Sequence, residues 1–171
     1  MKTAQNFGLM YILLAIIQIL ICNYCQFSPL LVLSVLPVMI LCLPLSVGTI
    51  PAMLIAFATG LAVDWLSEGL LGLNALSLVP VAAVRKPIMQ LFFGKDLIDR
   101  KDSLSFRKNG FGKISAAILT FHAIFLAIYI TADGAGMRPF WFNLARFGIS
   151  EASGYLISVI VASSLIPDDK K

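Results

Sequence analysis

Few side chains in this chain could do chemistry, and these few stand inside or beside long apolar stretches. The ionisable residues in question are Asp64, His122 and Glu151. An ionisable group in a membrane-spanning segment is costly, so it marks a functional site by default. Each also has a structural interpretation. Asp64 would position the turn after its helix, His122 would be hydrogen-bonded to a neighbouring helix, and Glu151 would be solvated at the membrane interface. We favour the structural interpretation for all three.

The motifs that carry catalysis are missing. No G-x-S-x-G, H-E-x-x-H or phosphate-binding loop is present. Cys22 and Cys25 match C-x-x-C, but a lone pair without a βαβ context is a weak redox or metal signal. We interpret both as ordinary residues at a helix end, with a disulfide left open for an oxidising compartment. We therefore expect no enzyme activity, no cofactor and no metal.

The composition places these residues in a membrane. Of 171 residues, 59% are hydrophobic and 13% are charged, which is about half the charge of a soluble domain. A bilayer core of roughly 30 Å needs about 20 apolar residues per helix, and continuous apolar runs favour helices over a barrel. The sequence predicts one all-α membrane domain, 1–171, with Pro37 and Pro80 kinking their helices. Its six spans are 7–25, 29–45, 47–63, 69–86, 114–131 and 149–166.

The distribution of Lys and Arg sets the predicted orientation. Six spans place the amino terminus, the polar segment Lys95–Lys113 and the tail on one side, with nine basic residues, against only Arg138 and Arg146 opposite. The positive-inside rule makes the richer side cytoplasmic, so both termini are predicted there. Trp65 and Trp141 then fall near the outer interface. In such a protein a net charge of +4 reports orientation and anionic-lipid contact, not nucleic-acid binding.

Two spans carry small residues at intervals of four, which lets helices approach closely in lipid. In the third span these residues lead to Asp64, which should point into the bundle or its outer mouth. The candidate packing or partner-binding positions on these two faces are Ala52, Ala56, Gly60 and Asp64, and then Ser150 and Gly154.

Basic residues form the other candidate group. Arg85 and Lys86 are predicted at the cytoplasmic end of the fourth span, followed by an interfacial or re-entrant piece at 88–93. The segment Lys95–Lys113 interleaves apolar and basic residues, as does a helix lying on an anionic leaflet. It equally suits a solvated loop that contacts a cytoplasmic partner. The predicted lipid or partner contacts are Arg85, Lys86, Arg100, Lys101, Arg107 and Lys108.

The stretch 60–78, GLAVDWLSEGLLGLNALSL, resembles the signature region of the rod shape-determining protein MreD family. That region is a small-residue helix ending in an acid, a glycine-containing turn, and Gly-x-Asn or Gly-x-His opening the next helix. The specific match covers about 20 residues, and the opening of the second span at Pro29 is also similar. The resemblance singles out Asp64, Gly69, Gly72 and Asn74 as structural signature residues. The Lys95–Lys113 segment and the Arg85-Lys86-Pro87 break depart from the family pattern.

The resemblance implies a bacterial inner-membrane scaffold of the cell-elongation machinery. Its partners would be MreC and, through MreC, MreB filaments and the RodA/class B penicillin-binding protein synthase. It also implies a fold similar to the substrate-binding subunits of energy-coupling-factor vitamin transporters. An alternative function is therefore such a transporter subunit, with an outward-facing pocket. The side chains expected to line that pocket are Trp65, Glu68, Trp141 and Glu151.

Overall fold

The structure is a computed structural model that describes residues 2–24, 28–67, 70–94, 109–134 and 137–166, with side chains described from Gly8 onward. These residues form helices and, in the described ranges, no strand, which confirms the all-α prediction. The helices are α1 (Lys2–Tyr24), α2 (Leu36–Leu41), α3 (Thr49–Leu66), α4 (Leu73–Ala83), α5 (Arg85–Phe93), α8 (Phe111–Gly134) and α9 (Phe140–Leu165).

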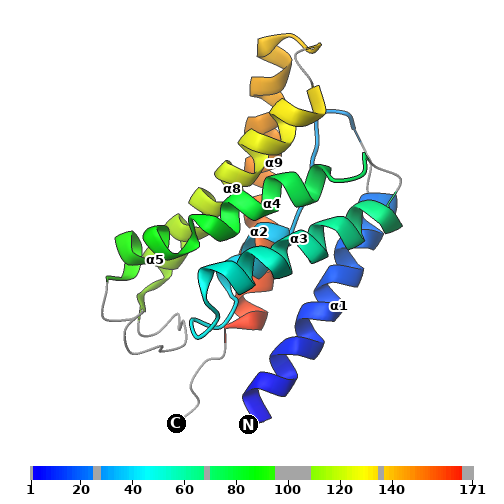
Figure 1. Cartoon of the computed structure of the whole chain (residues 1–171). Helices are drawn as coiled ribbons and strands as arrows, with labels where there is room; N and C mark the ends of the chain where they lie inside the picture. Colours follow the sequence, from blue (N-terminus) through cyan, green and yellow to red (C-terminus); the bar gives the residue numbers. More distant parts are fainter. Residues whose placement is uncertain (1, 25–27, 68–69, 95–108, 135–136, 167–171) are drawn as a thin grey trace.

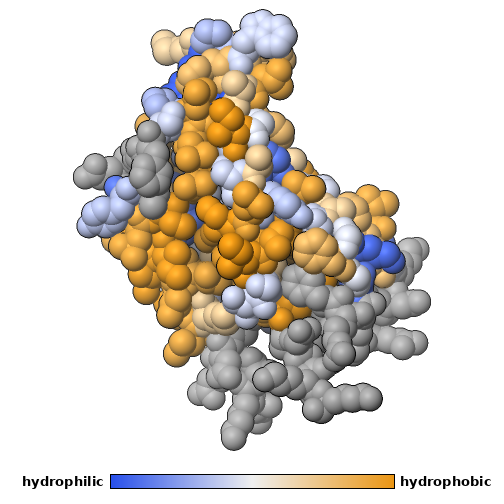
Figure 2. All heavy atoms as spheres, turned by 180° about the vertical axis from the view of Figure 1, so that it is seen from behind, coloured by the Kyte–Doolittle hydropathy of each residue, from blue (hydrophilic) through white to orange (hydrophobic). Residues whose placement is uncertain are grey.

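Three helices, α3, α8 and α9, are long and apolar enough to cross a membrane. The pair α4 and α5, bent by 48° at the break between them, would make a fourth span if taken as one. The part of α1 from Gly8 to Tyr24 is a shorter apolar helix. Apolar side chains cover most of the face in Figure 2. The chain therefore has the helices of a membrane protein, with three to four candidate spans where the sequence predicted six.

The second predicted span, 29–45, is wrong as a continuous helix. Residues 31–35 are non-helical, and α2 has only six residues, all buried. Proline at position 37 has no N–H to give to the carbonyl of Leu33, and its ring would collide with that carbonyl in a helix. The helix therefore begins just before Pro37, which lies in its first turn instead of kinking a longer helix. Pro44 follows soon after the helix ends.

The fourth predicted span, 69–86, is divided next to the Arg85-Lys86-Pro87 break and not at Pro80. Pro80 lies inside α4 without ending it. The helix stops at Ala83, four residues before Pro87, and α5 starts at Arg85 in a new direction. Because a proline removes the bond to the carbonyl four residues earlier, Pro87 accounts for the break. The predicted separate piece at 88–93 is the main part of α5.

The helices pack as two antiparallel pairs around the short α2. Helix α3 lies against α4, and α8 lies against α9, while α4 also contacts α8 and joins the pairs (Figure 1). The largest fully buried side chains include Met39 of α2 and Phe121 and Phe125 of α8. Helix α1 lies at the edge of the bundle and contacts α2 and α3.

The ends of the helices sort into two groups (Figure 1). The start of α1, the end of α5, the start of α8 and the end of α9 lie toward one end of the molecule. The end of α1, the α3–α4 turn and the α8–α9 connection lie toward the other, which we call the distal end. Helix α9 begins nine residues before the predicted start of the sixth span at 149, so it reaches well past α8 into the distal end.

Candidate functional site

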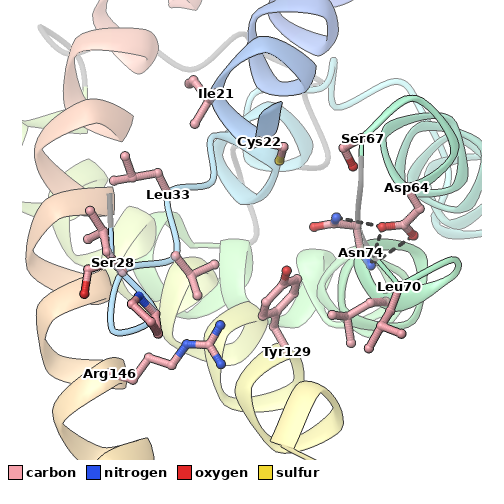
Figure 3. A pocket seen from close by; sticks show the side chains of 14 residues that line it. Ile21, Cys22, Ser28, Leu33, Asp64, Ser67, Leu70, Asn74, Tyr129 and Arg146 are labelled. Atoms are coloured by element: carbon pink, nitrogen blue, oxygen red, sulfur yellow. Dashed lines mark hydrogen bonds between the residues drawn. The ribbon is translucent and has the colours of Figure 1, made fainter. Parts of the chain in front are cut away.

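A cavity of about 380 Å³ opens at the distal end of the bundle (Figure 3). It is bounded by the last turn of α1, the non-helical segment 28–33, the α3–α4 turn, Tyr129 of α8 and Arg146 of α9. Its lining combines apolar side chains with a few polar groups, which is the usual character of a small-molecule site, and its volume falls in the usual range of roughly 300–1,000 Å³.

One wall of the cavity is made by Asp64 and Asn74. The carboxylate of Asp64, 2% exposed, accepts hydrogen bonds from the backbone N–H of Asn74 at 3.1 and 3.2 Å and of Ala75 at 3.3 Å. The side-chain amide of Asn74 donates a further bond at 2.8 Å. Asn74 and Ala75 are the second and third residues of α4, whose N-cap is Gly72. Since Gly72 has no side chain, Asp64 supplies from α3 the acceptor that an N-cap normally provides.

Gly60 sets the distance between α3 and α4 one turn away. A Cβ on Gly60 would lie 2.5 Å from the Cα of Ala75 and 2.6 Å from its nitrogen. Ala52 and Ala56 are buried on the same helix face. The small residues predicted from their spacing therefore pack within this chain, and Asp64 points inward as expected. Gly72 has a φ of +91°, so the turn into α4 uses the left-handed conformation that glycine adopts most readily.

The opposite wall is cationic. Arg146 is 8% exposed and donates through Nη1 to Asp133. Arg138 donates to the same oxygen of Asp133 at 2.9 Å. The Nε of Arg146 is buried and has no hydrogen-bond partner among the described residues. In Figure 3 the guanidinium of Arg146 points into the cavity toward Tyr129. An arginine this buried is unusual and indicates a specific role.

Segment 28–35 forms the floor between these walls, and side chains of other helices satisfy its backbone groups. Gln18 of α1 accepts from the N–H of Val35 at 2.7 Å and donates to the carbonyl of Leu33 at 3.2 Å. Ser150 of α9 accepts from the N–H of Val32 at 2.9 Å. Non-helical backbone is tolerated at membrane depth only when protein groups pair with it, and these bonds supply that pairing.

His122 of α8 also bonds to this segment, at Ser34. Its ring is fully buried, with Nε2 at 3.0 Å from the carbonyl of Ser34 and Nδ1 at 3.3 Å from Oε2 of Glu151. Because a carbonyl can only accept, Nε2 carries a proton. Gly154 leaves the space that the ring occupies, since a Cβ there would overlap the imidazole. The histidine thus bonds neighbouring segments, as its structural interpretation required.

Other sequence-predicted residues lie away from the cavity. Arg85 is buried and donates to the carbonyl of Leu43, so it does not sit at a solvated helix end, whereas Lys86 is exposed. Trp65 and Trp141 are 77% and 76% exposed, and neither they nor Glu151 line the cavity, which corrects the predicted pocket lining. The predicted residues Glu68, Gly69, Arg100, Lys101, Arg107 and Lys108 lie outside the described residues, as do Cys25 and most of Lys95–Lys113.

Sequence reasoning missed three polar residues that build the site: Gln18, Tyr129 and Arg146. Gln18 had a usable signal, because a lone amide inside an apolar run of α1 needs a partner within the protein. Arg146 was assigned to a connection because the predicted sixth span began at 149. In the described residues, no three His, Cys, Asp or Glu side chains gather as a metal site would require.

No family model, curated protein or solved structure matches this chain. The geometry of the described residues therefore has to support any functional conclusion.

Proposed function

We propose that this chain is a non-enzymatic membrane scaffold of the bacterial cell-elongation complex. It would lie in the inner membrane with both termini in the cytoplasm. It would bind MreC directly, and MreB and the RodA/class B penicillin-binding protein synthase through MreC. Anionic lipids would meet its basic cytoplasmic side.

The observation that carries this proposal is the structural unit formed by the MreD-like stretch. Gly60 permits the contact of α3 with α4, Asp64 caps α4, and Gly72 makes the turn between them. Asp64 and Gly72, which the resemblance singled out, and Gly60, which the spacing of small residues singled out, thus each have a structural role in joining two helices. Their chemistry is used in holding the bundle together, which suits a scaffold better than a catalyst.

The buried stripes direct partner helices to other faces. Because Ala52, Ala56 and Gly60 pack within the chain, they are not available to a partner. Large apolar side chains remain exposed on the outer faces of α1, α3 and α9, among them Ile16, Phe57 and Leu156. In a membrane, such faces meet either lipid or a partner helix.

Depletion in cells tests the proposal at the level of physiology. Under the scaffold function, rod-shaped host cells that lose the protein become round, and MreC co-purifies with the protein in mild detergent. A photo-crosslinking residue at Ile16, Phe57 or Leu156 should capture MreC from one of these faces but not from all. Normal cell shape after depletion, with no MreC crosslink from any face, contradicts the proposal.

The cavity favours a second function, the substrate-binding subunit of a vitamin-type transporter. It has the size and the mixed lining of a small-molecule site. The two functions differ in what accompanies the purified protein. A co-purified vitamin together with an ATPase module, and a nutrient requirement on depletion without loss of shape, support transport.

A further inference from the structure

We propose that the distal cavity binds a small molecule that has a carboxylate and an apolar body, and that Arg146 is the anchor for the carboxylate. The inference does not depend on the scaffold function. The protein could bind its partner proteins whether or not the cavity also binds this ligand.

The charge around Arg146 is unbalanced. Arg138 and Arg146 both donate to Asp133, so in the described residues two guanidinium groups share one carboxylate and leave one positive charge in excess. Arg146 is the buried member of the pair and the one that lines the cavity. A guanidinium this desolvated is costly, and a carboxylate in the cavity is the group that best satisfies it.

The other charged group of the lining does not offer a site for an amine. Asp64 is only 2% exposed, and its two oxygens accept from the backbone N–H groups of Asn74 and Ala75 and from the side-chain amide of Asn74, so its charge is largely satisfied within the chain. A cationic ligand would therefore find Asp64 buried behind its own hydrogen-bond partners and would meet the positive charge of Arg146. The cavity thus selects for an anion.

The apolar side chains of the lining indicate that the rest of the ligand is apolar. Ile21, Leu31, Val32 and Leu73 line the cavity, and the ring of Tyr129 lies beside the Arg146 guanidinium (Figure 3). Such a lining gains free energy by covering hydrocarbon or an aromatic ring. A volume of about 380 Å³ limits the ligand to a small molecule.

Calorimetric titration of the full chain in mild detergent tests the inference with three probes of one shape: benzoate, benzamide and benzylamine. Benzoate should bind at least tenfold more tightly than the neutral amide or the amine. Hexanoate and 3-phenylpropanoate serve as further carboxylate probes of different bodies. Binding of benzylamine or benzamide as tightly as benzoate overturns the inference, and so does the absence of binding by all three carboxylates.

Two arginine variants assign the anchor. Arg146→Gln should weaken carboxylate binding at least tenfold. Arg138→Gln also removes one positive charge beside Asp133, but the Arg138 side chain is not part of the lining, so it should weaken binding by a smaller factor than Arg146→Gln does. Equal effects of the two variants would reduce the role of Arg146 to general charge and overturn its assignment.

A third variant tests the cavity independently, in case Arg146→Gln misfolds. Leu70 lines the cavity but is 61% exposed, so Leu70→Trp can narrow the cavity without disturbing the core. It should abolish carboxylate binding while the melting temperature of the free protein stays unchanged. Unchanged binding in this variant would place the bound carboxylate elsewhere and contradict the inference.

Discussion

The buried polar side chains of this bundle mainly form hydrogen bonds with backbone groups of neighbouring segments. Asp64 is the clearest case, because its buried carboxylate accepts from two consecutive N–H groups of α4. Its location inside the bundle could be predicted from the spacing of four that links it to Gly60 and Ala56. The hydrogen-bond partners of Asp64 could not be predicted, because the sequence alone does not show that α4 begins directly after Gly72, which has no side chain to cap the helix.

Asp64→Asn should destabilise the protein by about 1–3 kcal/mol, since an amide leaves one acceptor and points its own N–H groups at the donors of Asn74 and Ala75. The melting temperature in detergent measures this. Trp65→Phe, at the neighbouring exposed position, is the control and should melt like the unmodified protein. An unchanged melting temperature for the Asp64 variant would contradict its role as a cap.

Two glycines of α9 offer a matched pair for His122. Gly154→Ala places a methyl group where the imidazole lies, so the ring must leave Ser34 and Glu151, and we expect a clear fall in the melting temperature. Gly148→Ala meets no described atom within 4 Å and should be neutral or stabilise the helix by up to about 1 kcal/mol. If both variants melt alike, the ring does not need the space at Gly154.

At the scale of elements, the sequence predicted helices best where apolar runs were long and had no proline beyond the first turn of the helix. The third, fifth and sixth predicted spans each correspond to one long helix, α3, α8 and α9. The second span failed because hydropathy measures how apolar a run is and not its conformation. Residues 31–35 are as apolar as a membrane-spanning helix. Because Pro37 has no N–H, however, the carbonyl of Leu33 has no helical hydrogen-bond donor, and the side chain of Gln18 donates to it instead.

Gln18→Leu tests the dependence of segment 28–35 on α1. The change keeps the volume of the side chain but leaves the N–H of Val35 and the carbonyl of Leu33 without their partner, at a cost of about 1–3 kcal/mol for each buried group. Amide hydrogen exchange at Val35 should accelerate strongly. Ile16→Leu, on the exposed face of α1, is the control. Exchange that stays slow in the Gln18 variant would show that another group pairs with this N–H.

At the scale of the whole molecule, the cavity depends on segments far apart in the chain, which is why sequence reading placed its lining wrongly. Arg146 and Asp64 stand on helices with no adjacency in sequence, and the interface tryptophans expected beside the pocket point outward. Hydropathy predicts which segments enter the membrane, but the polar contacts between them depend on how the helices pack.

The two groups of helix ends predict a simple topology. A fluorescent protein fused after Leu165 should fold in the cytoplasm and fluoresce, while alkaline phosphatase fused after Met137 should be active outside it. The reason is the excess of nine basic residues over two between the sides. An inactive phosphatase at the second position would contradict the proposed orientation of the whole bundle.

Segment 28–35 also has a consequence for biogenesis. Val32 depends on a hydroxyl 118 residues later, and Ser34 on an imidazole 88 residues later. The bond to Ser34 cannot form until α8 has been synthesised, and the bond to Val32 cannot form until α9 has been synthesised. The early part of the nascent chain therefore has to wait in the translocon or be shielded by a membrane chaperone. A nascent protein stalled before Ser150 should therefore be a substrate for quality-control proteases.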